Sequence, residues 1–207
     1  MSGNLKIGIS GGTFDPIHHG HLIISEIARD TFNLDKVLFI PTGTPPHKTN
    51  SVIADSNDRY EMVKRAVGSN PYFEASCIEI ERKGNTYTID TLLELRKQYG
   101  ENIDFYFIVG ADTVNEIVTW KEFEKVCGLC EFIAFKRPGS DIIQYEHVGE
   151  QLRKNYGAKI HFTDAPMVEI SSTDIRQRVQ SGRSIKYLVP EYVEEYIDIK
   201  KLYTKKN

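Results

Sequence analysis

The chain has 207 residues, of which 40% are hydrophobic and 27% are charged. This is the composition of an ordinary globular protein, and the length fits one domain over residues 1–207. The formal net charge of −3 leaves no basic face for DNA or RNA, and no apolar run is long enough to cross a membrane.

Strand-like and helix-like patterns alternate along the chain, which predicts an α/β fold with a doubly wound, Rossmann-like parallel sheet in three layers, α/β/α. The expected strands are Leu5–Ser10, Lys36–Ile40, Tyr72–Ser76, Asp104–Val109, Glu131–Phe135 and Lys159–Phe162. The expected helices are His21–Phe32, Asp58–Val67, Thr88–Tyr99, Asp112–Val126, Tyr145–Tyr156, Ser172–Ser181 and Pro190–Ile199. The longest irregular stretch, Pro41–Asn57, has the length of a functional or disordered loop.

The loop after the first strand reads Gly-Gly-Thr-Phe-Asp-Pro-Ile-His-His-Gly-His, from Gly11 to His21, and leads into a helix. A glycine-bearing turn of this kind exposes backbone N–H groups at the positive end of a helix, which favours a phosphate. Gly11 and Gly12 permit close approach of the backbone or a positive φ. Thr13 and the imidazoles of His18 and His21 add further donors. The loop therefore predicts a site for a nucleoside triphosphate.

The same histidines admit a second interpretation as metal ligands. His18, His19 and His21, together with Asp15, are residue types that bind zinc. At least three of them would have to converge on one point, whereas the neighbours His18 and His19 are expected to diverge. No resident metal is therefore expected.

A second candidate phosphate site lies near the other end of the chain, in the run from Glu169 to Arg176. The plain interpretation is a serine N-cap, with Asp174 as its capping-box partner. The functional interpretation notes free N–H groups, the hydroxyls of Ser171 and Ser172, and a guanidinium one turn later, all suited to a phosphate. Taken alone the run leaves both open, and the glycine–histidine loop favours the second.

Together the motifs His18-His19-Gly20-His21 and Ile170-Ser171-Ser172-Thr173-Asp174-Ile175-Arg176 resemble those of the HxGH-type nucleotidyltransferase superfamily. Pro45-Pro46-His47-Lys48, Gly110-Ala111-Asp112 and the single Trp120 are similar to features of the bacterial nicotinate-mononucleotide adenylyltransferases within it. The likeness covers nearly the whole chain, in motif order and spacing.

The resemblance implies that ATP lies across the first loop, that nicotinate mononucleotide accepts the adenylyl group, and that Mg²⁺ is carried with ATP. It implies catalytic roles for His18, His21 and Arg176. The implied ATP-binding residues are Gly11, Gly12, Thr13, Phe14, His18, His21, Ser171, Ser172 and Arg176. The implied nicotinate-mononucleotide-binding residues are Thr86, Tyr87, Thr88, Trp120, Asp112, His47 and Lys48.

Two of these acceptor features also have plain interpretations. Thr88 can be an N-cap for the helix Thr88–Tyr99, although the N–H groups of such a helix start also suit a nicotinate carboxylate. Trp120 is by default a core aromatic, although a lone tryptophan near a loop can stack on a pyridine ring. Two alternative functions also stay open. One is transfer to phosphopantetheine, and the other is a non-catalytic nucleotide-binding regulator on the same fold.

The three cysteines, Cys77, Cys127 and Cys130, suit a reducing compartment better than a disulfide framework, so a cytoplasmic location is expected. The spacing of Cys127-Gly-Leu-Cys130 is that of a redox pair or half a zinc site, but two structural thiols are the simpler interpretation. The sequence is compatible with a homo-oligomer and does not determine the oligomeric state.

Overall fold

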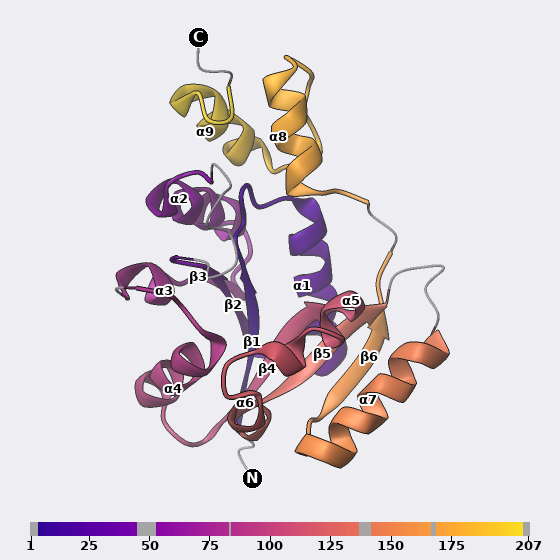
Figure 1. Cartoon of the computed structure of the whole chain (residues 1–207). Helices are drawn as coiled ribbons and strands as arrows, with labels where there is room; N and C mark the ends of the chain where they lie inside the picture. Colours follow the sequence, from indigo (N-terminus) through magenta and orange to yellow (C-terminus); the bar gives the residue numbers. More distant parts are fainter. Residues whose placement is uncertain (1–3, 45–52, 83, 137–141, 167–168, 205–207) are drawn as a thin grey trace. The chain divides into compact units, whose positions relative to one another are not determined.

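The computed structural model of the chain describes residues 4–44, 53–82, 84–136, 142–166 and 169–204 (Figure 1). Within these residues, six strands form one sheet in the order β3-β2-β1-β4-β5-β6. Parallel pairing joins β1 to β4, β4 to β5 and β5 to β6. The chain winds outward from β1 to β3 and then outward again from β4 to β6, so the doubly wound α/β sheet is confirmed.

The strands are β1 (Leu5–Gly12), β2 (Lys36–Pro41), β3 (Phe73–Ala75), β4 (Ile103–Gly110), β5 (Cys130–Lys136) and β6 (Ile160–Asp164). The helices are α1 (His19–Phe32), α2 (Ser56–Val67), α3 (Ile78–Glu81), α4 (Thr88–Tyr99), α5 (Ala111–Val114), α6 (Phe123–Leu129), α7 (Ile142–Tyr156), α8 (Ser172–Gln180) and α9 (Glu191–Lys200), with a short 3-10 helix η1 at Ile117–Thr119. No helix in the described ranges has the length and apolar character needed to cross a bilayer.

The chain divides into two compact units. The first unit contains Met1–Ser10, Ile24–Leu38 and Thr86–Met167, and the second unit contains Gly11–Ile23, Phe39–Asn85 and Val168–Asn207. Strands β1 and β2 begin in the first unit and end in the second. The interpretation of residues 1–207 as one domain stays a prediction.

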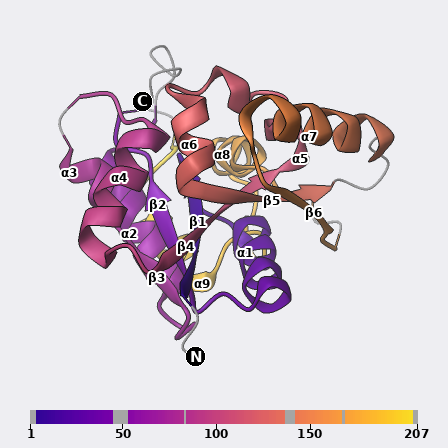
Figure 2. The same cartoon turned by 90° about the horizontal axis from the view of Figure 1, so that it is seen from below.

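In the first unit, helices cover both faces of the sheet (Figure 2). The ring of Phe32, in α1, lies 6.4 Å from that of Tyr106, in β4. The next residue of β4, Phe107, points to the opposite face and is paired with Phe132 of β5. The ring of Phe123, in α6, lies 6.3 Å from that of Phe132 on this second face. This unit therefore has the expected three layers, because alternate apolar residues of its strands are buried under helices on each side.

In the second unit, α2 packs against α9. Helix α2 begins where the Asp55 carboxylate accepts a hydrogen bond from the backbone N–H of Asn57, at 2.8 Å. At the contact, the hydroxyl of Tyr196 in α9 donates to Asp58 at 2.8 Å, and the guanidinium of Arg65 lies 4.9 Å from the centre of the Tyr196 ring. Helix α9 is thus joined to α2 by a hydrogen bond and by a guanidinium–ring contact.

The expected single helix over Asp112–Val126 is wrong, because the structure divides this segment into α5, η1 and α6. The Thr119 hydroxyl bonds back to the carbonyl of Glu116 at 2.7 Å. Glu122, the residue before α6, has a left-handed backbone with φ of 53°. Apolar residues recur at helical spacing across these breaks, so the sequence pattern alone does not show where one helix ends and the next begins.

Candidate active site

The loop after β1 brings its first and third histidines together. The imidazole rings of His18 and His21 are stacked, with centroids 3.7 Å apart and planes 26° apart. The backbone N–H of His18 donates to Nδ1 of His21 at 3.2 Å, so the neutral His21 ring carries its proton on Nε2. The edge-on contact of Phe14 with His21, at 5.0 Å and 82°, holds this ring from another side. His21 can therefore donate a hydrogen bond through Nε2.

Burial makes both imidazoles of this pair neutral at physiological pH. His18 is 6% exposed, and its burial, reinforced by the neighbouring His19, lowers its pKa to about 4. Burial, reinforced by His18, lowers the pKa of His21 well below its usual value. Nδ1 of His18 is buried and has no hydrogen-bond partner among the described residues. A buried polar atom without a partner costs about 1–3 kcal/mol, and a ligand that bonds to this nitrogen would offset that cost.

Gly20 allows the His18 ring to take this position. A Cβ atom at residue 20 would lie 3.1 Å from both Cε1 and Nδ1 of His18, closer than an ordinary van der Waals contact. The glycine between the histidines is therefore required by the close approach of an imidazole to the backbone at the start of α1.

The positive φ that Gly11 and Gly12 were expected to permit falls elsewhere in the loop. Both glycines end β1, and Gly12 has no positive φ. The left-handed residue is Phe14, with φ of 48°, and it is 3% exposed. A bulky residue adopts this conformation only where its surroundings impose it, and here the ring is held between His21 and Phe39.

The two candidate phosphate-binding segments contact each other. Ser171 caps α8 by accepting a hydrogen bond from the backbone N–H of Asp174, at 3.1 Å. The Ser172 hydroxyl donates to the carbonyl of Pro16 at 2.9 Å. Nη1 of Arg176 donates to the carbonyl of Asp15 at 2.7 Å. The N-terminal end of α8 is thus joined to the histidine loop, although the bonded residues are 156 and 161 positions apart in the sequence.

Arg59, which the sequence analysis did not identify, stabilises this loop through hydrogen bonds to backbone carbonyls. Its side chain is 2% exposed. It donates to the carbonyls of Thr13 and Thr42, each at 2.7 Å, and to those of Gly43 and Ala54, each at 3.1 Å. The buried charge is therefore surrounded by four carbonyl oxygens, and the loop, the end of β2 and the segment before α2 share one anchor.

The predicted carboxylate-binding segment opens α4, in the first unit. Tyr87 is the N-cap and Thr88 is the first helical residue, so the cap lies one residue earlier than the plain interpretation placed it. The Tyr87 side chain makes no capping hydrogen bond. Thr86 is buried, and its hydroxyl has no hydrogen-bond partner in the described part of the chain. A helix start with an unpaired buried hydroxyl beside it is suited to an anionic group.

Trp120 lies in the same unit, half-buried, with its ring 5.3 Å from that of Phe107 in an edge-on contact. The next residue, Lys121, has its ammonium 4.5 Å above the Tyr87 ring and 3.6 Å from the Asp90 carboxylate. The structure thus ties the segment that carries Trp120 to the start of α4.

Three predicted acceptor residues lie wholly or partly outside the described part of the chain. His47 and Lys48 lie outside the described residues. Asp112 is in α5, and its side chain lies outside what is described.

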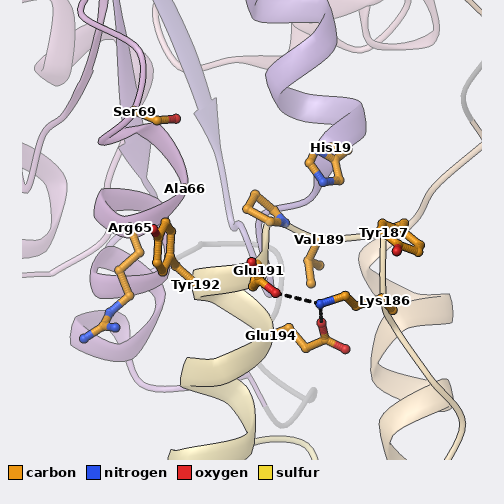
Figure 3. Close-up of a pocket in the computed structure, with 11 residues that line it drawn as sticks. His19, Arg65, Ala66, Ser69, Lys186, Tyr187, Val189, Glu191, Tyr192 and Glu194 are labelled. Atoms are coloured by element: carbon orange, nitrogen blue, oxygen red, sulfur yellow. Dashed lines mark hydrogen bonds and ion pairs between the residues drawn. The ribbon is translucent and has the colours of Figure 1, made fainter.

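His19 faces a different environment from its neighbours. It lines a surface pocket of about 560 Å³ in the second unit, which neither His18 nor His21 lines (Figure 3). In this pocket Lys186 bonds to Glu191 at 2.8 Å. Among the described residues, no group of three or more histidine, cysteine, aspartate or glutamate side chains could hold a metal ion. His19 therefore diverges from the stacked pair of His18 and His21, as expected for neighbouring side chains.

The cysteine pair has the properties of structural thiols. Cys127 and Cys130 are free, the first half-buried and the second buried. Burial raises the pKa of Cys127 to about 11 and raises that of Cys130 as well. Neither thiol is activated as a nucleophile or a redox centre.

A doubly wound sheet whose first strand ends in a loop of amides and imidazoles is typical of one class, the nucleotide-binding α/β proteins. The cytidylyltransferase-like family model matches residues 9–178. A relative from Thermoanaerobacter sp., named probable nicotinate-nucleotide adenylyltransferase, is 50% identical over 99% of this chain and 97% of its own length. A relative of the same name from Moorella thermoacetica is 49% identical over 96% of this chain and 91% of its own. The chain therefore belongs to the cytidylyltransferase-like family and, within it, to the nicotinate-nucleotide adenylyltransferases, as its motifs indicate.

Solved structures show the same fold. Plasmodium falciparum nicotinic acid mononucleotide adenylyltransferase complexed with APC matches with a TM-score of 0.74 and 21% identity, over 96% of each chain. The same enzyme complexed with NaAD matches with a TM-score of 0.75 and 22% identity, over 96% of this chain and 97% of that one. At these identities the likeness concerns the fold alone.

Proposed function

We propose that this chain transfers the adenylyl group of ATP to nicotinate mononucleotide, forming nicotinate adenine dinucleotide and pyrophosphate in NAD biosynthesis. The names of its relatives support this reaction, and they do not favour phosphopantetheine as the acceptor. The observation that carries the proposal is the junction of the histidine loop with α8, made by Ser172 with Pro16 and by Arg176 with Asp15. It supports the proposal because it brings the two candidate phosphate-binding segments, from opposite ends of the chain, into contact.

The reaction requires hydrogen-bond donors to the phosphate oxygens more than it requires a general base. The 5′-phosphate of the acceptor is already anionic at neutral pH, so it attacks the α-phosphorus of ATP in line, without a covalent enzyme intermediate. A rate enhancement of about 10⁶ requires about 8 kcal/mol of transition-state stabilisation, and one well-placed donor supplies about 3–4 kcal/mol. Several donors must therefore act together on the developing charge.

The neutral histidine pair is suited to this task. Because His21 accepts the His18 backbone N–H on Nδ1, its Nε2–H is left to donate to a phosphate oxygen. We propose His18 and His21 as catalytic donors at the phosphates, and Ser171, Ser172 and Arg176 as the residues that bind the departing pyrophosphate. Gly11, Gly12, Thr13 and Phe14 would contribute the backbone of the ATP site.

For the acceptor, we propose that the N–H groups at the start of α4, with Thr86, Tyr87 and Thr88, bind the nicotinate carboxylate, and that Trp120 contacts the pyridine ring. The buried, unpaired hydroxyl of Thr86 supports this assignment. Asp112, His47 and Lys48 remain proposed acceptor residues on the strength of the resemblance.

The family generally uses a divalent metal with ATP. The described part holds no cluster of metal-ligating side chains, and the loop presents N–H donors, which suit phosphate oxygens rather than a cation. We propose that Mg²⁺ enters bound to the triphosphate. We also propose a cytoplasmic location, which the free cysteines support. A homo-oligomer stays a prediction.

The acceptor is tested by measuring pyrophosphate release from Mg-ATP with purified protein. Nicotinate mononucleotide, nicotinamide mononucleotide and phosphopantetheine are supplied in separate reactions. We expect release with nicotinate mononucleotide. Release with phosphopantetheine alone would overturn the acceptor, and nucleotide binding without release in any reaction would indicate a non-catalytic regulator.

The donors are tested with three matched variants, His18→Ala, His21→Ala and His19→Ala. We expect the first two to lower kcat at least about 10²-fold while ATP binding largely persists, because each removes a donor that acts on transition-state charge. His19→Ala should retain turnover because His19 lines a different pocket. Equal turnover of all three variants would show that His18 and His21 take no part in the chemical step.

A further inference from the structure

Asp15 is a buried carboxylate at the centre of the histidine loop, and the proposed chemistry gives it no task. It is 4% exposed. Its partners come from three distant parts of the second unit: the backbone N–H of Ala54 before α2, the guanidinium of Arg176 in α8, and the hydroxyl of Tyr203 after α9. Arg59 also exerts its charge on Asp15.

The two carboxylate oxygens of Asp15 have different neighbours. Oδ1 accepts the Tyr203 hydroxyl at 2.8 Å and the Ala54 N–H at 3.2 Å. Oδ2 lies 3.8 Å from Nη1 of Arg176, the same nitrogen that donates to the backbone carbonyl of Asp15. Holding Oδ1 therefore fixes the rotation of the carboxylate, and with it the charge that faces the guanidinium.

The hydroxyl of Tyr203 keeps its proton in this position and therefore remains a hydrogen-bond donor. Its burial, and then the charge of Asp15, raise the pKa of its hydroxyl far above the physiological range. The turn after α9 has two residues with left-handed backbone, Lys201 with φ of 51° and Tyr203 itself with φ of 61°. Non-glycine residues hold this conformation where the surroundings impose it. The chain thus bends back after α9 and carries the tyrosine to the loop.

We propose that Tyr203 is a positioning residue for the phosphate site: its hydroxyl orients Asp15, and Asp15 holds Arg176 in place for the β- and γ-phosphates of ATP and for the released pyrophosphate. The inference rests on the proposed function, because it takes Arg176 to bind those phosphates. It gives the C-terminal segment a role in the reaction that the two recognised motifs do not contain. The Arg176 side chain is 28% exposed and is therefore only partly buried while Asp15 contacts it, which leaves it able to meet a phosphate.

The test removes one hydroxyl and uses a matched control. Tyr203→Phe deletes the bond to Asp15, and Tyr196→Phe deletes a bond of the same length, 2.8 Å, between the same residue types at Asp58. Both tyrosines lie near the C-terminus in the second unit, but only Tyr203 bonds to the loop. Steady-state kinetics are measured with Mg-ATP and nicotinate mononucleotide, together with inhibition by inorganic pyrophosphate and thermal unfolding.

We expect Tyr203→Phe to raise the KM for ATP and the inhibition constant of pyrophosphate about tenfold, the usual effect of losing one hydrogen bond to a charged group. The KM for nicotinate mononucleotide should change less than about twofold. Tyr196→Phe should lower the unfolding temperature without this substrate-selective pattern. A merely structural role of Tyr203 predicts the reverse: lower stability and equal effects on both substrates, or none. That outcome would overturn the proposal.

A second variant keeps the test informative if Tyr203→Phe is unstable. Asp15→Asn keeps an acceptor for the tyrosine but removes the charge that faces Arg176. It should give the same loss of ATP and pyrophosphate affinity, and the double variant Asp15→Asn/Tyr203→Phe should be no worse than Asp15→Asn alone, because both changes act through one contact. Additive losses would contradict the inference. Failure of the wild-type protein to release pyrophosphate would instead refute the proposed function, so the two failures are distinguishable.

Discussion

Gly20→Ala is the sharpest perturbation of the histidine pair, because it adds one methyl group at a known place. The new Cβ would lie 3.1 Å from Cε1 and Nδ1 of His18, so the ring must move by a few tenths of an ångström away from its stacked position. At the same time Gly20 is the second residue of α1, and alanine in a helix is more favourable than glycine by about 0.5–1 kcal/mol. The substitution therefore displaces a proposed catalytic donor with little expected cost to folding.

We expect Gly20→Ala to lower kcat about 10-fold to 10²-fold, since a misplacement of about 1 Å can cost about 10²-fold and this shift is smaller. Its unfolding temperature should stay close to that of the wild type. The assay is pyrophosphate release from Mg-ATP and nicotinate mononucleotide, with thermal unfolding measured on the same samples.

The matched control is Gly128→Ala, in α6, where the added Cβ meets nothing within 4 Å. This variant should keep full turnover and gain a little stability. Full turnover of Gly20→Ala as well would refute the argument that the close contact sets the His18 position. A large loss of stability would refute the expectation that the helix start tolerates the methyl group.

Three further predictions concern buried groups. The His18 pKa of about 4 lies below the unfolded value of 6.5, so the unfolded chain binds the proton first as the pH falls. The free energy of unfolding should therefore fall by up to about 3 kcal/mol between pH 6.5 and 4. Urea titrations should show a shallower pH dependence in His18→Asn than in the wild type, and equal slopes would contradict burial of His18 as the cause. Arg59→Lys should destabilise the fold by at least about 2 kcal/mol in urea unfolding, because lysine cannot satisfy four carbonyls. The control Arg65→Lys, at a partly exposed ion pair, should cost less than about 1 kcal/mol. Similar losses in the two variants would contradict the role of Arg59 as the anchor of the loop. Thr86→Val should leave the unfolding temperature unchanged or higher, since its hydroxyl is unpaired. The same variant should raise the KM for nicotinate mononucleotide. A loss of stability with an unchanged KM would indicate that the hydroxyl has a structural role instead.

The pairing of His18 with His21 could be anticipated from sequence because it depends on local spacing at a helix start. Residues three positions apart at a helix start can face the same bound group. The alternation of strand and helix patterns was equally local, and it predicted the doubly wound sheet. What spacing alone could not show was the charge state of the pair, because it results from burial by residues distant in the sequence.

The supports of the loop could not be predicted for the same reason. Asp15 is bonded to Tyr203 across 188 positions, and Arg59 reaches back 46 positions to Thr13. One weak signal existed for Arg59, which shares a helix face with the buried Met62 and Val63 at spacings of three and four. A charged residue on an apolar face is a reason to look for a buried anchor. No comparable pattern marks Tyr203, since the turn that delivers it is irregular.

The central claim is that the loop after β1 and the start of α8 bind one triphosphate, and a crystal structure with an unreactive ATP analogue tests it most directly. The account predicts phosphate oxygens within hydrogen-bond distance of an imidazole nitrogen of His18 or His21 and of the Arg176 guanidinium or the N–H groups that open α8. A triphosphate seated elsewhere, for example in the pocket beside His19, would contradict it.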